Sequence, residues 1–330
     1  MAKEALAPAT RAQYREVYKR FLHVVNGGAP ADSGISAEMV EEFCARRFKD
    51  GVAYGTIHRE LSAIRRQAID RGVPVSRNSP LLAQALKGWK RQSAKEEGTS
   101  PIPFSAIQRY CGKVRSTFPF DSLLIKAVLA CAFFGMLRVS EYTRKTHRDG
   151  RVTFLRRDQV SFLSDGKQIR HAFIHHAQTK TSRDKPGGER TTLWCSCVTG
   201  VCALHNLLDY LSAFDKRFAK SDQLFQFSNG RPLMYRDMTA LVATIASAAN
   251  TSKRWTPHSL RSGGATYLFL LDVPLGAIKI LGRWSLKGDT LEKSYVKPRL
   301  IKVVRHLDRY FSDTPGEQLR SLGRFGELLV

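Results

Sequence analysis

The most informative stretch of the sequence is KRWTPHSLRSGGATYLFLL, residues 253–271. Thr256 and Pro257 suit the N-cap and the first position of a helix. The spacing then puts His258 and Arg261 on one face of the first turns, beside free amide groups and the positive end of the helix dipole. A helix N-terminus of this kind binds phosphate readily. Taken alone, however, a capped helix with one histidine and one arginine is more often structural.

Two further features near this chemistry stand out. Gly263 and Gly264 weaken a helix but allow a neighbouring backbone to approach it closely. In CAFFGMLRVSEY, residues 131–142, Arg138 ends an apolar helix, and Glu141 follows three residues later. On a helical turn this spacing brings the carboxylate beside the guanidinium and could orient it. By itself the pair is more often a structural ion pair.

The first hundred residues carry apolar side chains at helical spacing, which predicts four short helices. Their approximate ranges are 7–26, 36–50, 54–71 and 79–92, with Ser36 as the cap of the second. The third helix carries basic side chains that could face phosphates, namely His58, Arg59, Arg65 and Arg66. The segment SAKEEGTSPIP, residues 93–103, has no apolar periodicity and several helix breakers. We therefore expect a helical domain over residues 1–95 and a linker over 96–103.

The rest of the chain, residues 104–330, predicts a larger second domain. Helical patterns at about 104–114 and 122–137 precede strand candidates, and helices resume after them. The strand candidates are residues 152–155, 159–163, 170–178 and 190–194. The expected fold class is mainly α with a small antiparallel β-sheet.

Composition points to a polyanionic partner. The 330 residues include 53 Lys and Arg against 29 Asp and Glu, a formal charge of +24. Both domains carry a positive charge. Residues 1–100 contain 17 basic and 11 acidic side chains, a net charge of +6, which leaves a net charge of +18 for residues 101–330. There is no apolar signal-peptide core or membrane-spanning run, and the six cysteines read as reduced thiols. We expect a nuclear address in a eukaryote or otherwise a cytoplasmic one, with no membrane partner and no secretion.

The sequence does not contain the common motifs of nucleotide hydrolases or zinc metalloproteases. The sequence has neither GxxxxGK[ST] nor HExxH. WCSCVTGVCALH offers Cys195, Cys197, Cys202 and His205 at spacings that a zinc ion tolerates, but the pattern is not a standard one. A plain strand-to-helix junction with small buried thiols is the preferred interpretation, so no metal or cofactor is expected.

The order of five motifs resembles the tyrosine recombinase (phage integrase) family. They are Arg138 with Glu141, TKTS at residues 179–182, PHSLR, LGRWS at 281–285 and EKSYVKP at 292–298. PHSLRSGGATYL with LGRWS is also similar to recombinases carried by eukaryotic transposable elements. The resemblance covers nearly the whole chain and implies a helical core-binding domain followed by a catalytic domain.

The resemblance also implies roles for individual residues. It makes Arg138 and Arg261 the two guanidinium clamps on the scissile phosphate, Lys180 the hairpin lysine, His258 the helix histidine, Trp284 the residue after LGR, Tyr295 the nucleophile and Glu141 a supporting acid. The family more often has histidine where Trp284 stands. Lys185 in the same hairpin and Tyr310 in HLDRYF remain rivals of Lys180 and Tyr295.

The side chains suit this chemistry without a metal. Two guanidiniums can pair with a phosphodiester as its charge grows, His258 can act as base toward the phenol, and a lysine can protonate the leaving 5′ oxygen. The expected product is a 3′-phosphotyrosine on duplex DNA, made by four chains acting together. We expect the apolar tail, about residues 312–330, to serve that assembly, although it could instead fold back on its own domain.

Two rival functions remain. A type IB topoisomerase resembles this family in its catalytic set but relaxes supercoils as a monomer. LGRWS and the amphipathic tail favour the recombinase over it. The other rival is a DNA-binding module that keeps the fold without turnover, and candidates at every catalytic position argue against it.

Overall fold

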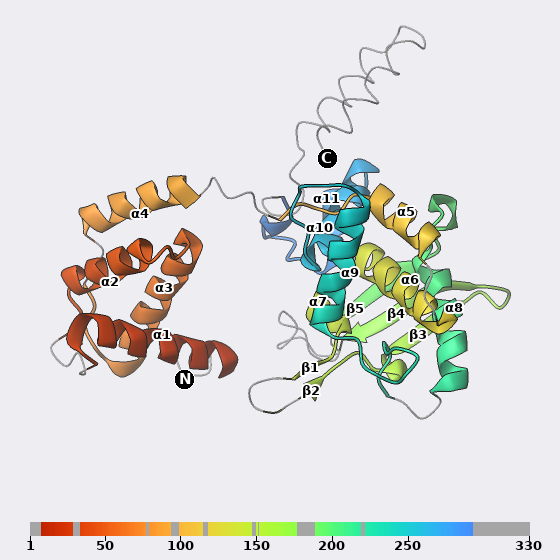
Figure 1. The fold of residues 1–330 in the computed structure, drawn as a ribbon, viewed down its shortest axis with the longest axis horizontal. Coiled ribbons are helices and arrows are strands. Elements are labelled where there is room, and N and C mark those ends of the chain that lie inside the picture. Colours follow the sequence, from red (N-terminus) through yellow and green to blue (C-terminus); the bar gives the residue numbers. More distant parts are fainter. Residues whose placement is uncertain are drawn as a thin grey trace, which may run out of the picture. The chain divides into compact units, whose positions relative to one another are not determined.

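The computed structural model describes most of the chain. It covers residues 8–28, 34–76, 79–93, 99–114, 118–146, 150, 152–176, 189–218 and 222–292. Within it the chain forms two compact units, residues 1–98 and 99–330, which we call the N-terminal and C-terminal units. Figure 1 shows the first as helices alone and the second as helices with two small sheets. No helix in the described ranges has the length and apolar character needed to cross a bilayer.

The N-terminal unit consists of four helices, as the apolar spacing predicts. They are α1 (Pro8–Asn26), α2 (Ala37–Lys49), α3 (Tyr54–Arg71) and α4 (Pro80–Ser93). Ser36 caps α2, because its Oγ accepts the amide of Met39 at 3.3 Å. The buried face of α3 carries Ile57, Leu61 and Ile64. The apolar spacing of this helix therefore corresponds to its buried face.

Glu60 is a buried charge in this core, and two arginines neutralise it. Its carboxylate is only 7% exposed and accepts two bonds of 2.9 Å from Arg47 and one of 2.9 Å from Arg20. A buried carboxylate needs such partners because its desolvation is costly. These contacts fasten α1 and α2 to α3.

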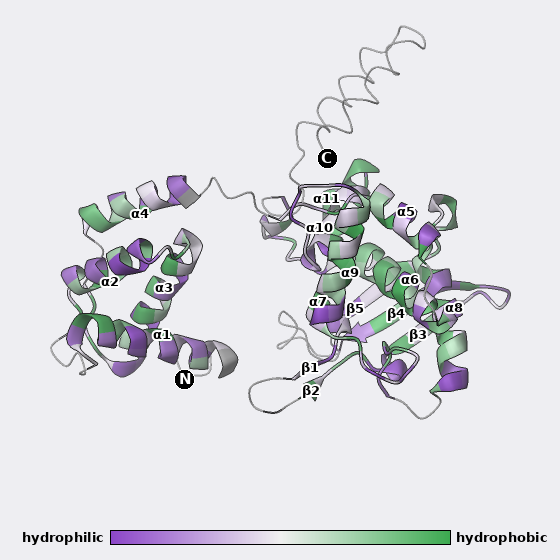
Figure 2. Ribbon diagram, viewed as in Figure 1, coloured by the Kyte–Doolittle hydropathy of each residue, from purple (hydrophilic) through white to green (hydrophobic). Residues whose placement is uncertain are grey.

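The C-terminal unit is built around α6. Its helices are α5 (Phe104–Lys113), α6 (Pro119–Phe134), α7 (Val139–Tyr142), α8 (Ala203–Arg217), α9 (Tyr235–Ala248), α10 (His258–Leu270) and α11 (Leu275–Gly282). The sequence of α6 is mostly apolar, apart from Asp121, Ser122 and Lys126, and Figure 2 shows much of the helix in the hydrophobic colour. A helix of this type belongs inside a domain. Phe133, Leu124 and Cys131 are fully buried in the core that α6 shares with α8 and α10.

Two glycines allow α10 to lie against α6. A Cβ on Gly264 would overlap the carbonyl oxygen of Phe133, and one on Gly263 would overlap that of Ile102. The close backbone approach expected for this pair is confirmed. It fixes the middle of α10 against the end of α6.

The strands form two antiparallel sheets. One has the order β3 (Val160–Ser164), β4 (Ile169–His176) and β5 (Glu189–Trp194). The other pairs β1 (Lys145–Thr146) with β2 (Val152–Thr153). The mainly α class with a small antiparallel sheet is thus confirmed, but the strand expected over residues 152–155 is only two residues long and belongs to the second sheet.

Candidate active site

Strand register brings three polar side chains to one end of the larger sheet. His176 pairs with Glu189, and Ile174 pairs with Thr191. Because strand side chains alternate, His176, Glu189 and Thr191 share the buried face with Ala172 and Leu193. The imidazole Nε2 of His176 lies 2.9 Å from the Thr191 hydroxyl. The buried face of the sheet is therefore apolar at Ala172 and Leu193 and polar at the end that carries His176 and Glu189.

Arg138 and Glu141 form a turn next to the end of α6. The helix ends at Phe134, so the expectation that Arg138 ends it is wrong; Arg138 instead precedes the first residue of α7. Glu141 accepts the Arg138 amide at 2.8 Å and its Nη1 at 2.8 Å. The predicted pair is real, and the carboxylate holds both the backbone and the side chain of the arginine.

Arg283 connects this turn to the sheet. It follows α11 in the left-handed conformation, at φ 60°, and its guanidinium is 4% exposed. Nη2 donates to Glu141 at 2.5 Å, Nη1 donates to the Thr191 hydroxyl, and Nε lies 3.7 Å from Glu189. The LGRWS motif thus contributes a structural arginine that no local sequence pattern singles out.

Helix α10 contributes His258 and Arg261. It begins at His258 after Pro257, and no side chain caps it, so the predicted Thr256 cap is wrong. Instead the Thr256 amide donates to the Ser259 hydroxyl at 3.0 Å. His258 is exposed at this end, whereas Arg261 is 1% exposed.

Arg261 is held from two sides. Its Nη1 donates to the carbonyl of Met136, and its Nη2 donates to that of Gly282 at 2.6 Å. The half-buried Trp284 lies against its face, with the guanidinium carbon 4.1 Å from a ring centroid. A cation over an indole face is stabilised by the ring's charge distribution. Trp284 therefore packs on the guanidinium of the second candidate clamp.

The charges of this site shift the pKa values of Glu141, His176 and His258. Burial favours the neutral form of Glu141, but Arg283, His176 and Arg138 outweigh it and leave the carboxyl pKa below its ordinary value. Burial and the positive charge of Arg283 lower the pKa of His176 to about 4. The side chain of His258 is solvent-accessible, but partial desolvation by the surrounding protein and the charges of Arg261 and Arg138 also lower its pKa. Both imidazoles are consequently neutral at physiological pH, and His258 can accept a proton.

The structure brings most of the predicted site together. Arg138 with Glu141 and Arg261 with Trp284 are in contact, and both arginines act on the charge of His258. Lys180 and Tyr295 lie outside the described residues, as do their rivals Lys185 and Tyr310. An exposed neutral imidazole near two guanidiniums can bind an anion and take a proton from a nucleophile beside it.

Sequence reasoning missed the residues that support this site. Arg283 was part of the LGRWS motif without a role of its own, His176 and Thr191 lay in strand candidates, and Glu189 stood one residue before the last of them. Alternation along residues 170–178 and 190–194 could have placed His176 and Thr191 on one buried face. Alternation could not have shown that Arg283 links this face to Glu141, because Arg283 and Glu141 are 142 residues apart in the sequence.

The basic side chains expected to face DNA lie on α3. His58 and Arg59 are exposed, while Arg65 and Arg66 are half-buried. Arg59 donates to the carbonyl of Gly55 at 3.0 Å, and Arg66 lies 3.0 Å from Asp70. DNA binding by these four residues remains a prediction.

Known structures share this architecture. A lambda integrase dimer bound to a COC′ core site has a TM-score of 0.54 at 16% identity, over 90% of this chain and 92% of that one. The Tn1549 transposon integrase in complex with transposon right end DNA has a TM-score of 0.55 at 16% identity, over 93% and 95%. A lambda integrase tetramer bound to a Holliday junction has a TM-score of 0.56 at 16% identity, over 89% and 73%. No curated protein sequence matches this chain.

The family assignment rests on the sequence match. The model of the phage integrase family matches residues 125–299, which is more than half of the chain. This range contains every predicted catalytic residue, from Arg138 to Tyr295. Since its fold is also that of known integrases, the chain belongs to the phage integrase family.

Proposed function

We propose that this protein is a site-specific DNA recombinase that cuts and rejoins duplex DNA through a 3′-phosphotyrosine on Tyr295. The observation that carries the proposal is the meeting of the Arg138–Glu141 turn, the start of α10 and Trp284 at one place in a member of this family. The integrases of like fold are bound to DNA, one of them as a tetramer on a Holliday junction. We propose the same substrate and a tetramer here.

The roles follow from the side chains. Arg138 is 24% exposed and paired with Glu141, so it can offer further N–H groups to a phosphate. Arg261 is buried under Trp284 and donates to two carbonyls, so we propose that the indole and these bonds shift when Arg261 contacts the phosphate. His258, neutral because its pKa is lowered, takes the phenol proton of Tyr295. Lys180 then protonates the leaving 5′ oxygen.

The decisive experiment is a covalent-adduct assay. The protein is incubated with duplex fragments from its own genomic flanks, and adducts are separated on a denaturing gel and sequenced. The wild type and Tyr310→Phe should form an adduct, while Tyr295→Phe should form none and still bind DNA. An adduct from Tyr295→Phe that Tyr310→Phe lacks would falsify the assignment of the nucleophile.

The topoisomerase alternative is tested on the same DNA. A recombinase joins strands from two different duplexes, whereas a type IB topoisomerase reseals the duplex it cuts. Joined products from two labelled fragments support the proposal. Relaxation of a supercoiled plasmid without joined products would support the rival.

We expect the reaction to take place where the DNA is, in the nucleus of a eukaryote or the cytoplasm of a prokaryote.

A further inference from the structure

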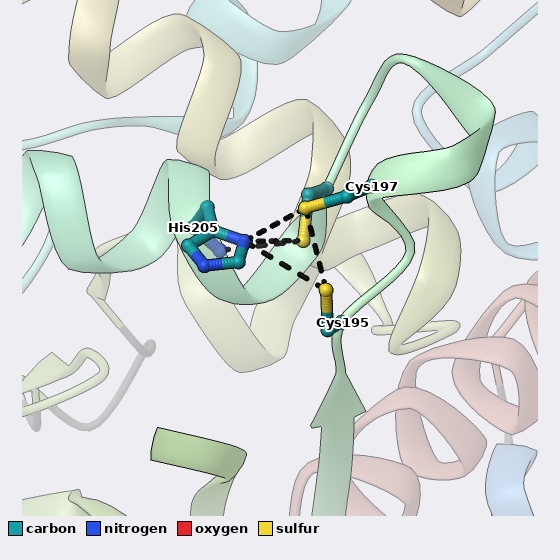
Figure 3. Close-up of side chains that lie close together, drawn as sticks. Cys195, Cys197 and His205 are labelled. Atoms are coloured by element: carbon teal, nitrogen blue, oxygen red, sulfur yellow. Dashed lines mark hydrogen bonds between the residues drawn. The ribbon is translucent and has the colours of Figure 1, made fainter. Parts of the chain in front are cut away.

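Four metal-ligating side chains converge where β5 passes into α8. Cys195 directly follows the strand, Cys197 begins the next turn, and Cys202 and His205 lie at the start of the helix. Their ligand atoms all lie within 4.8 Å of one another. Figure 3 shows the side chains of Cys195, Cys197 and His205 pointing toward a common centre. None of these residues belongs to the proposed catalytic site.

The distances fit a tetrahedral ion better than they fit a disulfide. Nδ1 of His205 lies 3.8, 3.0 and 3.2 Å from the sulfurs of Cys195, Cys197 and Cys202. The sulfurs of Cys195 and Cys197 are 3.3 Å apart. Zinc–sulfur bonds of about 2.3 Å place two tetrahedral sulfur ligands about 3.8 Å apart, whereas a disulfide needs about 2.05 Å. Small outward shifts of these side chains would accommodate a zinc ion.

The loop that carries the ligands is tightly built. The Ser196 hydroxyl donates to the carbonyl of Val201 at 3.0 Å, and that of Thr199 donates to the carbonyl of Ser196 at 2.7 Å. Gly200 turns the chain in the left-handed conformation at φ 74°. These bonds hold the ends of the loop together without the help of an ion, so the ligands are arranged in advance.

Backbone amides also favour a thiolate at Cys202. The amides of Ser196 and His205 point at its sulfur, at 3.3 and 3.5 Å. Cys202 is the N-cap of α8, where the helix dipole stabilises negative charge. Hydrogen bonds to a ligand sulfur of this kind are the usual support of a metal-bound cysteine. Three thiolates and one imidazole form a standard ligand set of structural zinc.

We propose that Cys195, Cys197, Cys202 and His205 bind one structural zinc ion. The sequence favoured a plain junction with small buried thiols, and that expectation is wrong for Cys195 and Cys197, which are exposed. The ion ties the end of β5 to the first turn of α8. The strand β5 also carries Glu189 and Thr191, which contact Arg283. The metal therefore stabilises a strand that supports the candidate active site.

Metal content of the full-length protein tests the proposal. Protein purified under reducing conditions should contain about one zinc per chain by elemental mass spectrometry. The double variant Cys195→Ser with Cys197→Ser should lose at least nine-tenths of it, because two ligands are gone. Val198→Ser, which changes a fully exposed side chain in the same loop, is the matched control and should keep the metal. Cys111→Ala, which removes a buried thiol elsewhere, should keep it too.

Cobalt(II) gives a second readout that does not depend on the folding of a variant. Wild-type protein stripped with a chelator and loaded with cobalt should show the thiolate charge-transfer and tetrahedral d–d absorption bands, and added zinc should abolish them. Removal of the metal should also lower the thermal midpoint of unfolding, since binding and folding are coupled. Wild-type protein that contains no zinc, shows no cobalt bands and forms a disulfide between Cys195 and Cys197 would overturn the proposal. Equal zinc in the double variant would also overturn it.

Discussion

At the scale of single residues, Glu141 is the carboxylate that pairs with two arginines of the site, Arg138 and Arg283. Its carboxylate is 7% exposed and lies between Arg138 and Arg283, at 2.8 and 2.5 Å. If this charge were lost, Arg138 would lose this carboxylate partner, and Arg283 would keep only Glu189, at 3.7 Å from its Nε. The acid therefore serves two purposes, since it orients a candidate catalytic arginine and neutralises a buried one.

Replacement of Glu141 by glutamine should destabilise the protein. Removing one partner of a buried ion pair costs about 3 kcal/mol, because the remaining charge stays buried. Urea unfolding of Glu141→Gln measures this loss. The control is Glu42→Gln, whose exposed pair with Arg46 should contribute less than about 1 kcal/mol. Similar losses in both variants would mean that the Glu141 pair is no more than a surface contact.

A second prediction at this scale concerns pH. Partial desolvation, Arg261 and Arg138 lower the pKa of His258, and only the neutral imidazole accepts a proton. The cleavage rate should rise with pH through this lowered pKa and be half-maximal below about 6.5, the ordinary value for histidine. Pre-steady-state cleavage from acidic to neutral pH tests this. If His258→Gln keeps the same acidic limb, another group is the base.

At the scale of elements, contact between α10 and α6 positions the site. The carbonyl of Phe133 lies where a Cβ of Gly264 would stand. The carbonyl of Met136, just beyond α6, accepts a bond from Arg261. Any separation of the two helices would therefore displace the second candidate clamp.

Gly264→Ala should separate these helices. Overpacking typically costs about 1–3 kcal/mol, and here the obstacle is backbone, which cannot rotate away. Urea unfolding should show a loss at the upper end of that range. Gly276→Ala is the matched control, because this glycine of α11 has open space around it, and alanine there should not destabilise. Equal stability of the two variants would contradict the close approach.

The sequence predicted the elements better than their connections. Apolar spacing gave the range of α3, residues 54–71, and the cap Ser36, because both are local signals. The strand β1 was not predicted, and β2 was predicted two residues too long, because a two-residue strand carries no periodicity. Thr256 looked like a cap, but the structure satisfies its own amide through Ser259. The link from Arg283 to Glu141 depends on how distant segments pack, which no local pattern encodes.

At the scale of the whole molecule, the charge of +24 predicts how DNA binding responds to salt. Each neutralised phosphate releases counterions, so the affinity should fall with a logarithmic slope of about 0.9 per contact. Arg59→Ala, on the exposed side of α3, should reduce that slope by about one contact. Arg46→Ala, whose guanidinium is paired with Glu42, is the control. Fluorescence anisotropy across a salt series measures both, and a nearly flat slope for the wild type would mean that the charge is not used on DNA.

Assembly is the last property at this scale. The proposed recombination cuts four strands, and with Tyr295 as its nucleophile each chain supplies one cut, so we expect four chains to meet on the DNA. The tail at residues 312–330, which lies outside the described residues, has apolar side chains at Leu319, Leu322 and Phe325. Docking them into a neighbouring subunit would bury this surface and couple it to assembly. Deletion of 312–330 should leave DNA binding but abolish the tetramer and strand exchange, as light scattering on target DNA and a joining assay would measure. A truncated protein that still forms complexes of full-length stoichiometry and recombines would show that the tail folds back on its own unit.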